Sequence, residues 1–405
     1  MHAPLNDQNS GLRKTGVATC ASVTTLAIVW LLMAAVVEPA FAQNERVIYN
    51  FRNLTDAYGP KCNLVLDAAG NMYGTTSGGG VHDLGAVFRV SPTGMETVLY
   101  SFAGGADGSN PVAGLFRDPA TGNLYGTTVN GGAFGNGTVF MLTPAGDESV
   151  LYSFKGGTTD GANPTSSVLR VGTTIFGTTF YGGAYGYGTV FKLTAAGQER
   201  VLHSFNSAYP ILDGSHPHAG LVLHNGVLYG TTTLGGVFNL GTVFSITPTG
   251  TEQVLHSFEG GSSDGQGPYA GLIFDQSGNF YGATYLGGTD NAGTVFTMNL
   301  QLGGVTLLHH FLINGVDGVN PYGTLIFSRG NFYGTTLQGG SANGGTVFKI
   351  TPGGSETVLH SFTGGTDGFN PDAALVLGNS NILYGTTIQG GATNLGTVFK
   401  MKVGP

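Results

Sequence analysis

Residues 228–258 read LYGTTTLGGVFNLGTVFSITPTGTEQVLHSF, and versions of this stretch recur along most of the chain. Its opening Tyr-Gly-Thr-Thr, or a near copy, begins at seven places: Tyr73, Tyr125, Phe176, Tyr229, Tyr281, Tyr333 and Tyr384. Successive copies are 51 to 53 residues apart. A fixed period of this length is the signature of a repeat architecture. The chain therefore contains seven copies of one structural unit.

Further motifs keep their order within the unit. Gly-Thr-Val-Phe or Gly-Ala-Val-Phe begins at Gly85, Gly137, Gly188, Gly241, Gly293, Gly345 and Gly396. A Val-Leu-His-Ser-Phe segment, or a variant, ends at Phe51, Phe102, Phe154, Phe205, Phe258, Phe311 and Phe362. An Asp-Gly pair follows in six units, and then a proline, which is Pro60, Pro111, Pro164, Pro217, Pro268, Pro321 or Pro371. The first unit keeps the proline but lacks the Asp-Gly pair.

Each unit predicts four short strands separated by Gly, Pro, Asn and Asp turns. In the fifth unit we expect the first three strands near residues 270–274, 280–284 and 294–298, and residues 253–258 are an example of the fourth. A single four-stranded meander cannot bury both faces, whereas seven packed around an axis can. The sequence predicts an all-β, seven-bladed β-propeller of four-stranded antiparallel blades. An open β-solenoid is the alternative.

The two ends of the repeat region favour a closed ring. A fourth-strand sequence at residues 45–51 precedes any first strand, and a third-strand sequence at residues 396–402 is the last one. We expect the N-terminal strand to complete the last blade, because this pairing hides two sheet edges. The terminal units of an open solenoid would instead look like caps.

The repeated Leu-Tyr-Gly-Thr-Thr, Gly-Gly, Gly-Thr-Val-Phe, Thr-Pro-x-Gly and Val-Leu-His-Ser-Phe motifs resemble the GloVer repeat of bacterial "choice-of-anchor tandem repeat GloVer-containing" proteins. The resemblance covers residues 45–402 and all seven units. It implies an exported protein of unknown activity, often held at the cell surface by a C-terminal anchoring segment. Only three residues follow Lys402, without a hydrophobic tail. We therefore expect release into the periplasm or medium rather than surface display.

The N-terminal residues predict a signal peptide. Arg13 and Lys14 precede an apolar, uncharged segment at residues 21–37, and Ala40-Phe41-Ala42 is a small-x-small cleavage site. The interpretation divides the chain into a signal peptide, 1–42, and a single propeller domain, 43–405, with a period of about 52 residues. A retained membrane anchor is the alternative. Cleavage leaves Cys62 as the only cysteine, and we expect a buried free thiol.

Composition excludes some partners. Only 9% of the residues are charged and the net charge is −8, without a basic cluster, so nucleic-acid binding is not expected. The 71 glycines among 405 residues recur mostly in turns, which argues against a low-complexity linker. We expect a monomer with no membrane span in the mature chain and an unidentified extracellular or periplasmic ligand.

The long loops between strands 2 and 3 and the crossings between blades emerge on one face, which is the natural binding surface around the channel mouth. Repeated aspartates stand in the crossings: Asp107, Asp160, Asp213, Asp264, Asp317 and Asp367. A carboxylate ring could bind a cation, but we interpret these residues as turn builders whose carboxylates accept backbone N–H groups. Likewise, His203, His256, His309 and His360 replace Tyr at one strand position, and we interpret them as half-buried aromatic residues.

A localised site is expected where the units differ. The longest crossing holds Asp213 with His216 and His218, a set that could bind a transition metal, although no third His or Cys has metal-ligand spacing. A loop of the third unit carries Tyr181, Tyr185 and Tyr187, which could stack on sugar rings, and a loop of the fifth carries Asp290. These seven residues are the candidate ligand-binding set. No catalytic residue, metal or other cofactor is assigned, and calcium stays open.

No H-E-x-x-H, G-x-S-x-G or phosphate-loop motif is present. We therefore favour a non-enzymatic exported propeller that binds a glycan, peptide or surface component through its long-loop face. The alternatives are a propeller enzyme, such as a lyase, hydrolase or quinone-dependent dehydrogenase with its site at the channel mouth, and a structural or adhesive matrix component. An enzyme should bring several polar, non-repeated residues with displaced pKa values together at one end of the channel.

Overall fold

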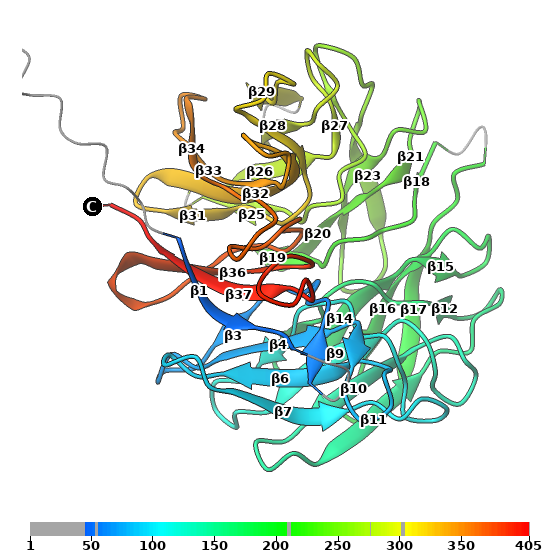
Figure 1. Cartoon of the computed structure of the whole chain (residues 1–405). Coiled ribbons are helices and arrows are strands. Elements are labelled where there is room, and N and C mark those ends of the chain that lie inside the picture. The colour runs from blue at the N-terminus through cyan, green and yellow to red at the C-terminus, as the bar shows by residue number, and fades with distance from the viewer. Residues whose placement is uncertain (1–44, 53–55, 209–211, 276, 301–303, 405) are drawn as a thin grey trace, which may run out of the picture. The chain divides into compact units, whose positions relative to one another are not determined.

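The computed structural model describes residues 45–52, 56–208, 212–275, 277–300 and 304–404. The expected signal peptide and its cleavage site at Ala42 lie outside the described residues. The described residues form seven antiparallel blade sheets, one from each repeat, arranged around a common axis, with four separate two-stranded sheets beside them (Figure 1). This confirms the seven-bladed β-propeller. One short 3-10 turn, η1 (Asn379–Asn381), interrupts the otherwise all-β described chain.

In the first four blades the strands pair in chain order. They are β3 (Val65–Leu66), β4 (Met72–Thr76), β6 (Ala86–Val90) and β7 (Glu96–Ser101) in blade 1; β8 (Phe116–Arg117), β9 (Leu124–Thr128), β10 (Thr138–Leu142) and β11 (Glu148–Ser153) in blade 2; β13 (Leu169–Val171), β14 (Thr174–Thr179), β16 (Thr189–Leu193) and β17 (Glu199–Ser204) in blade 3; β19 (Val222–His224), β20 (Val227–Thr232), β22 (Thr242–Ile246) and β23 (Glu252–Ser257) in blade 4.

The last three blades repeat this order. They comprise β25 (Ile273–Phe274), β26 (Asn279–Thr284), β28 (Thr294–Asn299) and β29 (Val305–His310) in blade 5; β31 (Ile326–Ser328), β32 (Asn331–Gly339), β33 (Thr346–Ile350) and β34 (Glu356–Ser361) in blade 6; β35 (Val376–Leu377), β36 (Ile382–Thr387), β37 (Thr397–Lys402) and, from the N-terminal end, β1 (Arg46–Asn50) in blade 7.

The pairing of β1 with β37 closes the ring, as the sequence predicts. In Figure 1 the blue strand β1 lies beside the red strand β37. The register joins Arg46 to Lys400 and Asn50 to Thr397, with a shift after Val47. The same register shift occurs between the third and fourth strands of the other six blades. β1 is therefore a regular outer strand, and its bulge increases the local twist as in the other blades.

The crossings between blades pair with the long loops of the blade they enter. The pairs are β2 (Ala57–Tyr58) with β5 (Gly78–Gly79), β12 (Gly161–Ala162) with β15 (Tyr181–Gly182), β18 (Gly214–Ser215) with β21 (Leu234–Gly235), β24 (Gly265–Gln266) with β27 (Leu286–Gly287), and β30 (Gly318–Pro321) with β32. Because these ladders join the crossings to the strand 2–3 loops, the long-loop face has its own backbone framework.

Neighbouring blades meet through one repeated aromatic contact. The Phe that ends each outer strand packs edge-on against the Phe of the third strand in the next blade, with ring centroids 5.1 to 5.3 Å apart at all seven seams. The glycine of Tyr-Gly-Thr-Thr lies under the third-strand ring. A Cβ on Gly230, for example, would stand 2.7 Å from Cζ of Phe244. The third-strand phenylalanine therefore fits only where the neighbouring residue of Tyr-Gly-Thr-Thr has no side chain.

Two further repeated residues join the blades. The first Thr of Tyr-Gly-Thr-Thr donates its hydroxyl to a backbone carbonyl of the next blade at 2.8 to 3.3 Å in six of the seven units. The fifth unit has Ala283 at this position. Each repeat proline packs on the glycine of the preceding Gly-Thr-Val-Phe motif, which has a φ of about +98° at Gly85. The repeated residues therefore build the contacts between blades.

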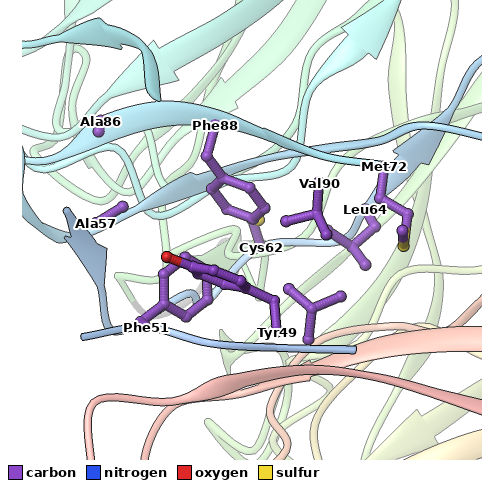
Figure 2. Packing of buried hydrophobic residues seen from close by; sticks show 10 residues of the cluster. Tyr49, Phe51, Ala57, Cys62, Leu64, Met72, Ala86, Phe88 and Val90 are labelled. Atoms are coloured by element: carbon purple, nitrogen blue, oxygen red, sulfur yellow. The ribbon is translucent and has the colours of Figure 1, made fainter. Parts of the chain in front are cut away.

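The seam between blade 7 and blade 1 shows this packing in detail. In Figure 2, Tyr49 of β1 and Phe51, which directly follows β1, approach Phe88, and Cys62 lies behind that ring. Cys62 is buried, and the Thr75 N–H group donates a hydrogen bond to its Sγ at 3.0 Å. Burial raises the pKa of the Cys62 thiol to about 11. The cysteine is an inert core residue, as expected from the sequence.

Two details differ from the sequence prediction. The first strand of blade 5 begins at Ile273 rather than near Ala270, because the residues after each proline run along the central cavity before they pair. The first unit does have the turn aspartate. Asp56 stands four residues before Pro60, which is the spacing of the other units, but Ala57 replaces the glycine.

We predict that Thr75→Val will destabilise the propeller by about 1 kcal/mol, because the carbonyl of Ala113 loses the hydroxyl that binds it across the seam. Chemical denaturation measures the loss. Thr306→Val, at an exposed position of β29, is the matched control and should change stability little. Equal effects of the two substitutions would contradict a role for the Thr hydroxyl between blades.

Candidate functional site

The repeated aspartates hold the turns that contain them. Each carboxylate accepts a backbone N–H group of its crossing at 2.6 to 3.1 Å in all seven units, Asp56 included. In six units it also accepts a hydrogen bond from the Tyr or His of the outer strand: Tyr152 donates to Asp160 at 2.8 Å and His203 to Asp213 at 2.8 Å. In the remaining unit, His309 lies 3.5 Å from Asp317 without a hydrogen bond. Tyr and His exchange at this position because both offer a ring-borne donor.

A glutamate of the next blade faces most of these aspartates. Burial, and then repulsion by the facing aspartate, raises the pKa of Glu45 and Glu96 to about 8. The same causes raise the pKa to about 7 for Glu148, Glu199, Glu252 and Glu356. His203, Asp213 and Glu252 bring one ligand atom each within 4.8 Å of one another. Among the described residues no other such group is this close, whereas the facing Asp and Glu recur around the ring as part of the scaffold.

The three candidate residues of the crossing before blade 4 lie in different surroundings. The carboxylate of Asp213 binds His203 and the N–H groups of Asn206 and Gly214. His216 packs among aromatic side chains of the blade 3 loop, and His218 lines the central cavity. Pro217 separates the two histidines, so they face different surroundings. The three residues therefore do not form one metal centre.

Four of the candidate residues do meet in one aromatic group. The rings of Tyr181 and Phe180 are 4.8 Å apart, Phe180 lies 4.9 Å from His216 and 6.2 Å from His218, and Tyr187 lies 5.9 Å from His216. From His218 the contacts continue to Tyr269 at 5.2 Å and Tyr322 at 5.4 Å. We call the continuous series Tyr181, Phe180, His216, His218, Tyr322 and Tyr269 the aromatic band.

His216 has an unusual backbone. Its φ is +55°, in the left-handed region, where four of the other crossings have Asn and two have Gly just before the proline. In blades 3, 6 and 7 this Asn donates its side-chain N–H to a carbonyl of the preceding loop, for example Asn163 to Val129. The buried Nδ1 of His216 has no such partner. His216 is therefore strained and is poorly suited to the scaffold.

The residues that follow the prolines surround a central cavity of about 210 Å³. This position differs in almost every unit and supplies Lys61, Val112, Thr165, His218, Tyr269, Tyr322 and Asp372. Asn63, Ser167 and Thr324, two residues further along, also contribute to the wall. Each blade therefore contributes one variable residue to the wall of the channel mouth, whereas the blades themselves are regular repeats.

One side of the cavity is aromatic. Tyr269 and Tyr322 stack with centroids 5.1 Å apart, and Tyr285 packs against Tyr269 at 5.4 Å. The Tyr322 hydroxyl lies 3.0 Å from Nε2 of His218. Burial lowers the pKa of His218 to about 4, against a hydrogen bond to the Tyr269 backbone, and burial raises the pKa of Tyr322. Both groups are therefore neutral at neutral pH.

The adjoining part of the wall is polar and lies at the seam between blades 7 and 1. Asp372 is 9% exposed, and its buried Oδ1 has no hydrogen-bond partner. Burial raises the pKa of Asp372 to about 7, while Lys61 and the Asp372 backbone N–H oppose this shift. Lys61 itself is exposed. No salt bridge within 4.0 Å joins the two side chains among the described residues.

A second hollow lies at the rim of blade 3. Tyr181 and Tyr185, 49% and 55% exposed, line an open groove of about 540 Å³ together with Asn136 and Thr158. Asp290 lies elsewhere, where its carboxylate accepts the N–H group of Ile313 at 3.0 Å. The sequence-predicted tyrosines are therefore at the outer end of the aromatic band, whereas Asp290 joins a loop to the next crossing.

Of the cavity residues the sequence predicts only His218. It misses the others, among them Lys61, Tyr269, Tyr322 and Asp372. Each is a lone residue in its own unit, and only the ring brings them together. A signal was nevertheless present, because the position after each repeated proline changes in size and charge from unit to unit, whereas the next position is always a small residue: Cys, Ala, Ser or Gly. Aligning the seven units and comparing that column would have identified the cavity wall.

We predict that the propeller becomes less stable as the pH rises from about 5 to about 9. The six glutamates, with pKa values near 7 to 8, bind protons more tightly in the folded chain than in the unfolded chain, whose value is 4.5. Stability therefore falls as they lose those protons. Tm measured across this range should fall, and Glu45→Gln with Glu96→Gln should flatten the curve. Glu259→Gln, at an exposed site, should not.

We also predict that His216→Asn will raise Tm, because Asn adopts the left-handed conformation more readily and fits the position as Asn163 does in blade 3. The gain should be about 1 kcal/mol in chemical denaturation. The reverse substitution, Asn163→His, should be destabilising. A loss of stability in His216→Asn would show that the histidine contributes to the scaffold.

No helix among the described residues is both long and apolar enough to cross a membrane. In fold, the chain is similar to the oligogalacturonate lyase of Vibrio parahaemolyticus, at 10% identity and a TM-score of 0.56, over 90% of this chain and 95% of that one. It is also similar to an extracellular domain assigned to a one-component system of B. thetaiotaomicron, at 10% identity and a TM-score of 0.51, over 83% of this chain. The chain spans 37% of that protein's length. Identities this low show the fold alone.

No curated protein matches the sequence. The sequence profile of the Gloeobacter/Verrucomicrobia repeat matches residues 60–291 and 274–404. These two segments cover nearly all of the described propeller. The chain belongs to the Gloeobacter/Verrucomicrobia repeat family.

Proposed function

We propose that this chain is an exported, glycan-binding propeller whose ligand lies along the aromatic band and enters the central cavity. The band carries the proposal. It runs through side chains from the crossings and loops of blades 3 to 6, from the exposed Tyr181 to Tyr269 at the cavity. A sugar ring has apolar C–H faces that pack on aromatic rings, and its hydroxyls need hydrogen-bond partners nearby.

Polar groups stand beside the aromatic rings at both ends of the band. The cavity offers Thr165, Ser167, Thr324 and Asn63 near Tyr269 and Tyr322. The rim groove offers Asn136 and Thr158 near Tyr181. A ligand that occupies the groove and the cavity together is several sugar rings long, so the arrangement favours an oligosaccharide over a free monosaccharide.

The strain at His216 supports the same assignment. A residue that fits the scaffold less well than Asn, and whose ring joins the band, is expected where function has overridden stability. Export is part of the proposal and is supported by the apolar segment at residues 21–37 with Ala40-Phe41-Ala42 after it.

Catalysis in the same cavity is the second candidate function. His218, Tyr322 and Asp372 are non-repeated polar residues at one end of the channel, and burial displaces the pKa of each. This is the pattern expected of an enzyme site. Incubating each bound glycan with the protein and analysing it by mass spectrometry distinguishes the two functions, because only catalysis changes the ligand.

A glycan array probed with and without calcium, followed by titration calorimetry, tests the proposal. Tyr322→Leu should lower the affinity for a bound oligosaccharide about tenfold or more, because the cavity loses a stacking ring and a hydroxyl. Tyr181→Ala should weaken long oligosaccharides but leave dimers unaffected, because only long ligands reach the rim.

Phe327→Ala is the matched control, since Phe327 is a 46% exposed aromatic residue of β31 outside the band. It should leave the affinity unchanged. The proposal fails if no glycan binds with or without calcium, or if Tyr322→Leu and Phe327→Ala have the same effect.

A further inference from the structure

The cavity has one basic and one acidic side chain, and both stand at the seam where the ring closes. Lys61 follows Pro60 in blade 1, and Asp372 follows Pro371 in blade 7. Their segments are tied together two residues further on, where the N–H group of Ala374 donates to Oδ1 of Asn63 at 2.7 Å. The two charges therefore occupy corresponding positions of adjacent blades.

The charge of the cavity follows from its surroundings. Asp372 faces Lys61, the Tyr322 hydroxyl and the Cys62 thiol, and the last two are neutral at neutral pH. With a pKa of about 7, Asp372 is mostly protonated in slightly acidic solution. His218 is neutral there, since its pKa is about 4, and Lys61 is the basic side chain of the wall. The cavity is then positive, although the chain as a whole has a net charge of −8.

The buried Oδ1 of Asp372, which has no hydrogen-bond partner, indicates which kind of ligand group the positive cavity would bind. A buried carboxyl oxygen without a partner is costly unless a ligand supplies one. A protonated Asp372 is a hydrogen-bond donor, and a Lys ammonium has donors only. Together they complement an acceptor that carries negative charge, and a carboxylate on the ligand meets both requirements.

We propose that the cavity binds a sugar ring that bears a carboxylate, a uronic acid, with the carboxylate at Lys61 and Asp372 and the ring against Tyr269 and Tyr322. This inference rests on the proposed glycan-binding function and names its ligand class. The hydroxyls of Thr165, Ser167 and Thr324 lie around the same cavity and complement the hydroxyls of the ring.

A pH dependence follows. The carboxylate binds best while Asp372 holds its proton, so the affinity should fall as the pH rises through about 7, by up to about tenfold per pH unit above it. Asp372→Asn keeps a donor at this position at every pH. The variant should therefore bind with the same affinity on both sides of neutrality.

The test uses trimers of galacturonic, glucuronic and mannuronic acid, each beside its carboxyl-reduced counterpart, in titration calorimetry at about pH 6 and about pH 8. At the lower pH at least one acid trimer should bind about tenfold more tightly than its reduced form. Lys61→Gln should abolish this preference, and Lys61→Arg should retain it. Asp372→Asn should retain the preference and remove the pH dependence.

The outcomes separate the two proposals. If the reduced trimers bind as tightly as the acids, the uronate inference is wrong and glycan binding stands. If no trimer of either kind binds and the glycan array is also negative, both are wrong. Asp372→Asn could fail to fold, which its Tm would show. The variant of the exposed Lys61 then tests the inference alone, because Lys61→Gln overturns it by retaining the preference for the acid trimers.

Discussion

The edge-on contact between two phenylalanines at each seam is the constraint on which the rest of this structure depends. It recurs seven times at 5.1 to 5.3 Å, and it sets the spacing between blades. The third-strand ring occupies the space where a side chain on the neighbouring glycine would lie, as at Gly230. The first Thr of Tyr-Gly-Thr-Thr and the repeated proline make further contacts between the same two blades. The seventh contact, between Phe51 and Phe88, exists only because β1 closes the ring.

This regular scaffold explains where a site can be. The repeated Phe, Thr and Pro residues contact the next blade, so substitution there weakens a seam. The residue after each proline makes none of these repeated contacts, and it lines the cavity that the seven blades enclose. Variation concentrated at this one position can change the ligand without changing the ring. His216 departs from the repeated pattern. Its ring connects the cavity to the rim, although its backbone has the left-handed conformation that Asn and Gly adopt more readily.

Much of the fold could be predicted from the sequence because its signals are local and repeated. The period, the strand order and the closing strand were read from motif spacing alone. The site was predicted only in part. His218, His216, Tyr181 and Tyr187 were chosen because their units differ from the others, and they meet in one aromatic group. Asp213 was chosen with them, but its carboxylate is occupied by its own turn.

The sequence by itself determined the number of blades, their strands and the closure, because each depends on residues close together in one repeat or on the order of the chain ends. Only the tertiary structure decided which side chains share the cavity. Lys61 and Asp372 are separated by almost the whole propeller in the chain, yet they stand on adjacent blades because the ring closes between them. Their burial, which sets the protonation of Asp372, exists only in the assembled ring.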